Sequence, residues 1–206
     1  MKSVKNIILK PISKAGAIKI VEKYHYSHKI SPTSQICLGA YYNNILSGVI
    51  IYGIPIAAKT FQTVNNTKAK ECLELQRLAL SPEMAKNSES RVISISLKII
   101  KKRYPHIKWI VSFADENQNH LGIIYQATNW IYTGEGSGMN IYVKNGKKYH
   151  NRNVSRYKRL YNLNEEDLIK VGFEILKQKK KHRYYYFLHQ ECKKDLKYKI
   201  LPYPKV

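Results

Sequence analysis

The pattern of apolar and polar positions along this chain predicts an ordered series of strands and helices. Short runs rich in β-branched and aromatic residues predict strands, and an apolar period of three to four residues predicts helices. The expected strands are residues 5–12, 36–42, 45–53, 72–80 and 109–113. The expected helices are residues 13–24, 90–102 and 120–128. Ser13 is expected to cap the first helix, and Asn43 and Asn44 suit a tight hairpin.

The helix at residues 90–102 competes with a second interpretation. Residues 93–99 alternate between apolar and polar positions as a strand would, while Val92, Ile95 and Ile99 fit one helical face. The length of the segment and the capping residues Asn87 and Ser88 favour the helix.

The composition of the chain indicates a polyanionic partner. It has 36 lysines and arginines against 14 acidic residues, a net charge of +22, which is more than a small domain needs for solubility. Nucleic acid is therefore the first candidate. Seventeen tyrosines add flat surface that can stack on bases or bind phosphates. The codon bias of an AT-rich genome is another source of lysine, so the position of the charge matters.

One stretch of the chain concentrates basic residues without acidic ones. Between Lys144 and Leu163 they alternate with tyrosines, and they are Lys144, Lys147, Lys148, Arg152, Arg156, Lys158 and Arg159. No helix is predicted there to account for them, so we expect these side chains to contact DNA phosphates. A second basic cluster, residues 177–183, has an alternative explanation as the basic end of a helix that residues 164–167 cap at its acidic start.

Length and cysteine content predict a soluble protein of a reducing compartment. A chain of 206 residues is long enough to bury a full core. Cys37, Cys72 and Cys192 form no CxxC pair, so neither a disulfide framework nor a zinc knuckle is expected. We recognise no signal peptide and no membrane-spanning segment, which makes the cytosol the expected location.

A polar elbow after the strand at residues 109–113 is the leading candidate for a site. Asp115 follows this strand, and the helix expected next carries Tyr125. Ligands of open α/β sheets bind beyond the carboxyl ends of strands, where Asp115 stands. The alternative is that Asp115 only caps the following turn.

Several motifs together resemble the Mom family of bacteriophage DNA modification proteins. They are residues 24–28 (YHYSH), 74–82 (ELQRLALSP), 87–91 (NSESR), 112–115 (SFAD), 122–130 (GIIYQATNW) and 202–205 (PYPK). The order of the expected elements is also that of the GNAT-like acyltransferase fold. The resemblance implies an α/β (α+β) fold of this type, with a central mixed sheet flanked by helices and a basic C-terminal extension. We expect residues 1–160 to form the GNAT-like catalytic domain and residues 161–206 to form a helix and strand extension packed on the same domain.

The resemblance also implies a function. An enzyme of this family would convert the N6 amine of adenine in double-stranded phage DNA to a carbamoylmethyl (acetamido) derivative, protecting the DNA from restriction in the bacterial host cytosol. Carried over by motif, the functional positions are His25, Tyr26, Arg77, Ser90, Asp115 and Tyr125. The residues leave other classes open: a non-catalytic nucleic-acid-binding protein, or a GNAT-like transferase acting on RNA or a ribosomal protein.

The chemistry explains these residue types. The adenine amine is a weak nucleophile, so bond formation requires a base or a strongly activated donor. Asp115 is the candidate base and His25 the alternative. Arg77 would neutralise Asp115, clamp the donor, or only form an ion pair with Glu74 or Asp115. The rings of Tyr26 and Tyr125 would stack on a flipped-out adenine, or only pack against the core.

The sequence does not identify the donor. GNAT enzymes bind pyrophosphate with a glycine-rich loop, but residues 81–90 contain no glycine, which calls acetyl-coenzyme A into question. Backbone N–H groups at the helix start, with Ser88 or Ser90, would still hold an anionic donor. His25, His28 and Asp115 could bind iron or another divalent ion, but their spacing is a weak signal, and we assign no metal site.

Overall fold

The computed structural model describes residues 2–136, 140–149 and 151–205, without the side chain of Arg152. The strands are β1 (Ile7–Pro11), β2 (Ser34–Tyr42), β3 (Ile45–Gly53), β4 (Cys72–Leu80), β5 (Trp109–Asp115), β6 (Ile131–Glu135), β7 (Ile141–Lys144), β8 (Lys147–Tyr149), β9 (Glu174–Leu176) and β10 (Lys181–Phe187). The helices are α1 (Lys14–Tyr24), α2 (Ala58–Phe61), α3 (Ser88–Arg103), α4 (Ile123–Gln126), α5 (Asn151–Tyr161) and α6 (Glu165–Lys170). Short 3-10 turns lie at Val4–Asn6, Ala69–Glu71, Glu116–Gln118 and Gln190–Asp195.

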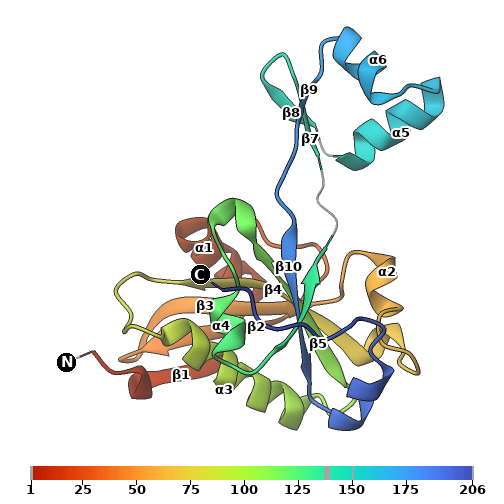
Figure 1. Cartoon of the computed structure of the whole chain (residues 1–206). Helices are drawn as coiled ribbons and strands as arrows, with labels where there is room; N and C mark the ends of the chain where they lie inside the picture. The colour runs from red at the N-terminus through yellow and green to blue at the C-terminus, as the bar shows by residue number, and fades with distance from the viewer. Residues whose placement is uncertain (1, 137–139, 150, 206) are drawn as a thin grey trace. The chain divides into compact units, whose positions relative to one another are not determined.

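The chain forms two compact units. Unit 1 consists of Met1–Phe113, Gly122–Gly134 and Arg183–Val206, and unit 2 consists of Ala114–Leu121 and Glu135–His182. These boundaries differ from the division expected at residue 160. The last segment returns to unit 1 because β10 lies between β5 and β6 in the sheet (Figure 1).

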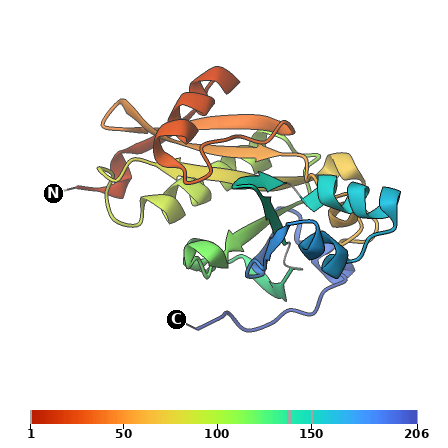
Figure 2. The same cartoon turned by 90° about the horizontal axis from the view of Figure 1, so that it is seen from above.

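A seven-stranded mixed sheet forms the centre of the fold, in the order β1-β2-β3-β4-β5-β10-β6 (Figures 1 and 2). Strands β1 to β4 are antiparallel neighbours, and β4 pairs with β5 in parallel. Alternate residues of β3 face opposite sides, since Val49 packs with Val21 of α1 while Tyr52 bonds to Ser96 of α3. Helices therefore cover both faces, as expected for this fold class.

Local sequence signals fix several of these elements. The Ser13 hydroxyl accepts the Gly16 N–H at 3.1 Å and caps α1, which confirms the prediction. Asn43 and Asn44 adopt left-handed φ angles of 49° and 63° and form the predicted hairpin. The helix expected at residues 90–102 is confirmed as α3, although the side chain of Asn87 makes no capping bond.

The helix expected at residues 120–128 is shorter than predicted. It is reduced to α4, which begins after Gly122 at a φ of 82°. A Cβ atom at Gly122 would lie 2.4 Å from the ring of Tyr184, so this position needs glycine both for its φ angle and for its close approach. The left-handed φ angle of Gly122 is not helical, so α4 begins only after this residue.

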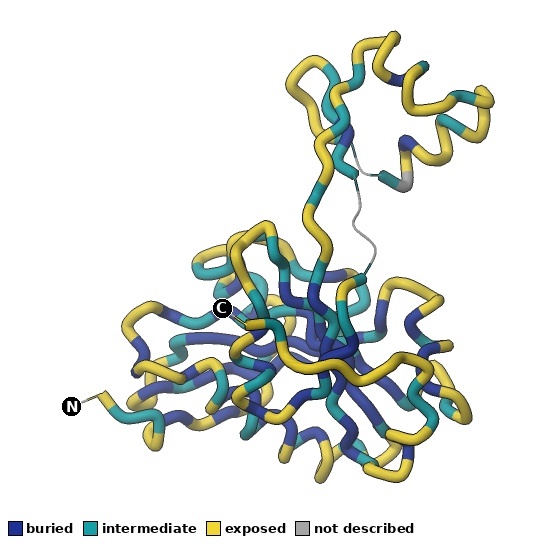
Figure 3. Tube along the Cα trace, viewed as in Figure 1, coloured by how far each residue is buried: buried dark blue, intermediate teal, exposed yellow. Residues whose placement is uncertain are grey.

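Unit 2 has a small core of its own. Its sheet has the order β8-β7-β9, and Tyr142, Val154 and Leu168 are its buried apolar residues. Most of α5 and α6 is exposed (Figure 3). The predicted cap holds, because Asn164 and Asp167 form a reciprocal capping box at the start of α6.

Two expectations about the basic clusters are wrong. Helix α6 ends at Lys170, so residues 177–183 are not its basic end. Conversely, α5 forms in the stretch for which no helix was predicted. Val154, Tyr157 and Tyr161 recur at a helical spacing there, but the prediction rested on the basic residues of the stretch and did not use this period.

The three cysteines are free and buried, in agreement with the absence of a predicted disulfide framework. Burial raises the pKa of the Cys72 thiol to about 12, so it stays protonated at neutral pH. Among the described residues, no helix combines the length and apolar character that crossing a membrane requires.

Candidate active site

Strands β4 and β5 run together only over their first residues. Their register pairs Cys72 with Trp109, Leu73 with Ile110 and Glu74 with Val111, although the strands continue to Leu80 and Asp115. Beyond this point a side chain replaces the ladder, because the Ser112 hydroxyl donates to the Leu75 carbonyl at 3.0 Å. The carboxyl ends of two parting parallel strands are where open α/β sheets bind ligands.

Tyr125 is held at the point where the strands part. Its hydroxyl is 2.8 Å from Ser112 Oγ, and its ring centroid lies 5.2 Å from those of Trp130 and Tyr184. The residue is only 6% exposed, and burial raises the pKa of its hydroxyl to about 12. Tyr125 is therefore protonated at neutral pH, and it offers a hydroxyl rather than an exposed ring face.

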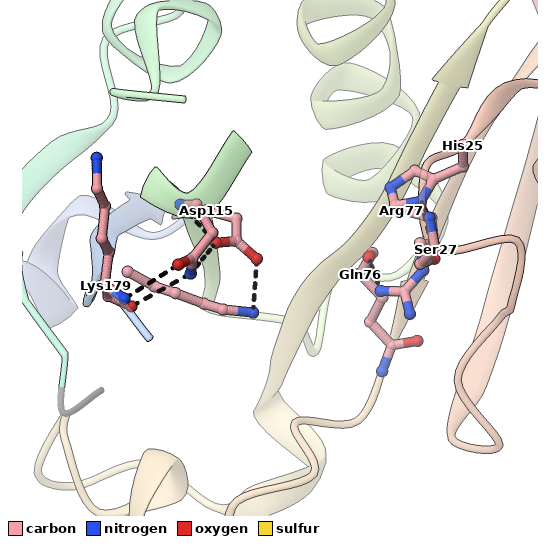
Figure 4. A network of polar contacts seen from close by, with 8 residues as sticks. His25, Ser27, Gln76, Arg77, Asp115 and Lys179 are labelled. Atoms are coloured by element: carbon pink, nitrogen blue, oxygen red, sulfur yellow. Dashed lines mark hydrogen bonds and ion pairs between the residues drawn. The ribbon is translucent and has the colours of Figure 1, made fainter. Parts of the chain in front are cut away.

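His25 directly follows α1 and is oriented by Ser27 (Figure 4). The Ser27 N–H donates to His25 Nδ1 at 3.1 Å, and Ser27 Oγ lies 2.8 Å from the same nitrogen. Because a backbone N–H can only donate, Nδ1 carries no proton, and the proton of the neutral ring is on Nε2. His25 in this arrangement is better suited to donate through Nε2 than to act as a base.

Tyr26 extends the flat surface of His25. The two rings stack with their centroids 4.3 Å apart and an interplanar angle of 28°. Tyr26 is 51% exposed, so the pair presents aromatic surface to solvent. Such a surface is suited to stacking on a nucleobase.

Arg77 holds the segment that follows His25. Its Nε donates to the Lys29 carbonyl at 2.8 Å, and a second guanidinium N–H donates to the carbonyl of Gln76 (Figure 4). The bond to Lys29 joins β4 to the chain just after the YHYSH motif, while the bond to Gln76 stays within β4. The hydrogen bonds of the Arg77 guanidinium to Lys29 and Gln76 thus end on carbonyls of unit 1, which suits a positioning role.

Gln76 is a site residue that the sequence interpretation missed. It is buried, and its amide donates to Thr33 Oγ1 at 2.8 Å and to the Ile54 carbonyl at 3.2 Å. Its carbonyl oxygen accepts from Ser34 Oγ at 2.8 Å. The sequence did contain a signal, because Gln76 follows Leu75 within a strand rich in leucine. A polar side chain that such a strand buries needs hydrogen-bond partners.

Asp115 belongs to unit 2, and its carboxylate has local partners (Figure 4). Asn117 donates to its Oδ1 through the backbone at 3.0 Å and through the side chain at 2.9 Å, and Lys181 Nζ lies 3.3 Å from Oδ2. Burial raises the pKa of the Asp115 carboxyl, but the bonds from Asn117 and the charge of Lys181 outweigh it, so this pKa lies below its usual value. Asp115 therefore caps the turn that follows β5, which is the alternative role considered from the sequence. Its carboxylate is ionised at neutral pH.

Three of the four lysines of the second basic cluster have acidic partners in unit 2. Lys179 lies 3.7 Å from Glu116, Lys180 lies 3.4 Å from Glu135, and Lys181 pairs with Asp115. Their charge is thus partly compensated within the unit.

One group of potential metal ligands occurs among the described residues. Atoms of Glu116, Glu135 and His182 lie within 4.8 Å of one another, and both glutamates also face lysines. His25 and His28, the histidines considered as metal ligands from the sequence, do not belong to this group. His25 Nδ1 bonds to Ser27, and His28 Nδ1 lies 2.6 Å from the Glu22 carbonyl.

The serines at the start of α3 point back into their own turn. Ser90 Oγ donates to the Asn87 carbonyl at 3.1 Å, and Ser88 Oγ donates to the Ala85 carbonyl. Because residues 81–90 also lack glycine, this turn does not reproduce a glycine-rich pyrophosphate loop.

The basic residues of α5 and β8 differ from the paired lysines of the second basic cluster in their lack of acidic partners among the described residues. Lys147, Lys148, Arg156 and Arg159 are exposed and Lys158 is half-buried, while the side chain of Arg152 lies outside the described residues. Within the described ranges, no ion pair links any of these side chains to an acidic residue. Their charge is therefore available to a polyanion.

Known structures identify the fold class of the chain. It resembles the spermidine/spermine N-acetyltransferase SpeG from Vibrio cholerae, with a TM-score of 0.52 and 9% identity, over 93% of this chain and 98% of that chain. A dodecameric spermidine N-acetyltransferase from Vibrio cholerae gives a TM-score of 0.51 and 8% identity, over 89% and 95% of the two chains. The fold is that of the GNAT acetyltransferases, which confirms the expected class.

The family follows from sequence comparison. The model of the Mom protein family matches residues 6–205, and the chain belongs to this family. Methylcarbamoylase mom of Escherichia phage Mu is 31% identical over 211 residues, which cover 98% of this chain and 85% of that protein. The resemblance inferred from the motifs is thereby confirmed.

Proposed function

We propose that this chain modifies the N6 amine of adenine in double-stranded DNA by attaching a carbamoylmethyl (acetamido) group. The observation that carries the proposal is the 31% identity to the methylcarbamoylase of phage Mu over nearly the whole chain. The acetyltransferase fold and the uncompensated basic residues of unit 2 support it. A substituted amine would hide recognition sequences, so we infer that the modification protects phage DNA from restriction in the host cytosol.

The described residues suggest a division of roles. The exposed ring of Tyr26, stacked on His25, supports an adenine flipped out of the duplex. N6 then forms one N–C bond and loses one proton, while the leaving group departs with the bonding electron pair. In this proposal Asp115 orients the amine or accepts its proton, His25 donates a hydrogen bond through Nε2, and Arg77 positions the segment that bears His25.

The donor in this proposal is a small activated molecule other than acetyl-coenzyme A. The β4–α3 turn lacks glycine, and the hydroxyls of Ser88 and Ser90 already donate to carbonyls of their own turn. The fold alone therefore does not provide the pyrophosphate loop on which coenzyme A binding in GNAT enzymes depends.

Expression of the chain in bacteria is expected to add a carbamoylmethyl mass to deoxyadenosine. Plasmid DNA from these cells would be digested to nucleosides and analysed by mass spectrometry, with DNA from cells carrying the empty vector as the control. Unmodified adenine in cells that contain folded protein would overturn the proposal. If that protein still binds DNA, the result would favour a non-catalytic nucleic-acid-binding protein.

Replacing Lys147 and Lys148 with alanine is expected to weaken duplex binding and flatten its salt dependence. Each lost phosphate contact lowers the slope of log K against log salt by about 0.9, so the double variant loses about 1.8. Fluorescence anisotropy at several salt concentrations measures this slope.

The matched control replaces Lys179 and Lys180, which removes the same charge from lysines that already face Glu116 and Glu135. We expect this control to change the slope less. An equal loss in the two variants would show that binding depends on total charge and not on the lysines of β8.

A further inference from the structure

Helix α5 presents a mixed basic and apolar face to solvent. Val154 on its inner side is buried against Tyr142 and Leu168, which fixes the rotation of the helix in unit 2. The helical period of 3.6 residues places Asn153, Arg156 and Leu160 together on the opposite side. All three are exposed, and Leu160 is 72% exposed.

Charge identifies what this face can bind. Arg156 and Arg159 have no acidic partner among the residues that the structure describes. The adjoining strand β8 adds the exposed Lys147 and Lys148. A duplex nucleic acid is the occupant with matching charge.

Residue types distinguish base reading from general phosphate attraction. The basic residues described on the outer side of α5 are arginines, whereas β8 carries lysines. Arginine forms two parallel hydrogen bonds to guanine O6 and N7, asparagine does the same with adenine, and an apolar side chain contacts the thymine methyl group. An exposed leucine beside arginines gains nothing from phosphates, but it does gain from the base edges of the major groove, which admits an α-helix.

We propose that α5 enters the major groove and that Arg156 reads a guanine near the target adenine, while Lys147 and Lys148 contact phosphates. The identity of the target rests on the proposed function. The recognition itself concerns binding only, so it can be tested without any modification of the DNA.

The first test selects duplexes from a random library with the full chain. Wild-type protein is expected to enrich a short motif that contains guanine. Arg156→Lys retains the charge but is expected to lose the preference at one position, with affinity for random DNA within about threefold of wild type, because lysine cannot form the paired contact. Lys148→Ala, the matched control, is expected to weaken binding to all sequences alike and keep the motif.

The second test needs no variant. The selected duplex is remade with 7-deazaguanine at the enriched position, which removes the N7 acceptor in the major groove and preserves base pairing. Wild-type protein is expected to bind it about fivefold more weakly or worse. This measurement decides the question if Arg156→Lys fails to fold.

Several results would overturn the proposal. These are selection without any sequence preference, an unchanged motif with folded Arg156→Lys, or equal affinity for the 7-deazaguanine duplex. A dimer that Leu160→Glu dissociates would assign the face to a second copy and overturn it too. Guanine preference without modified adenine would contradict the proposed function alone, whereas modified adenine without this preference would contradict the role of α5 alone.

Discussion

Asp115→Asn is expected to lower adenine modification at least about 100-fold, the usual minimum effect of removing a general acid or base. Asparagine keeps a side-chain oxygen that can accept the Asn117 N–H, so the turn remains capped. It loses the negative charge that Lys181 faces. DNA affinity is expected to stay equal or tighten slightly, because a carboxylate makes no attractive contact with phosphates.

The experiment compares modified deoxyadenosine per protein and duplex binding in the same preparations. Asp167→Asn is the matched control, because Asp167 is also a capping carboxylate of unit 2 that accepts a backbone N–H, from Asn164 at 2.9 Å. Full activity of Asp115→Asn would show that Asp115 only caps its turn.

The lowered pKa of Asp115 sets the direction of its pH dependence. A carboxyl whose pKa is lower in the folded state stabilises the fold above its unfolded pKa, which is about 4. This stabilisation is lost as the pH falls through the still lower folded pKa. Asp115 should therefore contribute no titration near neutral pH to the modification rate.

Gln76→Leu is expected to lower the free energy of unfolding of unit 1 by about 2–4 kcal/mol, because several partly buried polar groups lose one hydrogen-bond partner each. Leucine leaves the Ile54 carbonyl and the Thr33 and Ser34 hydroxyls without their amide partner, and a buried polar group that loses its partner costs about 1–3 kcal/mol. The same change should loosen the segment that bears His25, so modification should also fall.

Tryptophan fluorescence during urea unfolding measures this effect. The two tryptophans of the chain, Trp109 and Trp130, are both buried in unit 1, so the signal reports the unfolding of that unit. Gln35→Leu is the control, because Gln35 is exposed on β2 and should change the unfolding free energy little. Equal unfolding curves for both variants would contradict the role assigned to Gln76.

Local signals predict most of unit 1 because they act over a few residues. Ser13 caps α1 through an N–H three residues away, and Asn43 and Asn44 supply the left-handed angles of their own hairpin. The Gln76 network could not be predicted in this way, since its partners Thr33 and Ile54 are 43 and 22 positions away. Helix α5 was missed for a different reason, because the stretch was interpreted from its charge, although Val154, Tyr157 and Tyr161 recur at a helical spacing.

The sequence predicts part of the candidate site, as it predicts part of the fold. The motifs indicate His25, Tyr26 and Arg77, and the structure joins their segments through the bonds from Arg77 and Gln76 to the chain after α1. Ser90 and Asp115 instead have partners within their own turns. The catalytic roles of Ser90 and Asp115 remain predictions. The sequence indicates which residue types are present, but it does not show that these side chains already form hydrogen bonds within their own turns.

The two ends of the main segment of unit 2, residues 135–182, lie next to each other. It leaves the sheet after β6 and returns in β10, and the Gly136 N–H donates to the Lys181 carbonyl at 2.8 Å. Insertions whose ends are adjacent are tolerated well because the host fold keeps its register. In evolution, such a segment can be exchanged or lengthened as a module. We therefore expect relatives to diverge in DNA preference through this insertion while unit 1, which carries His25, Gln76 and Arg77, is inherited unchanged.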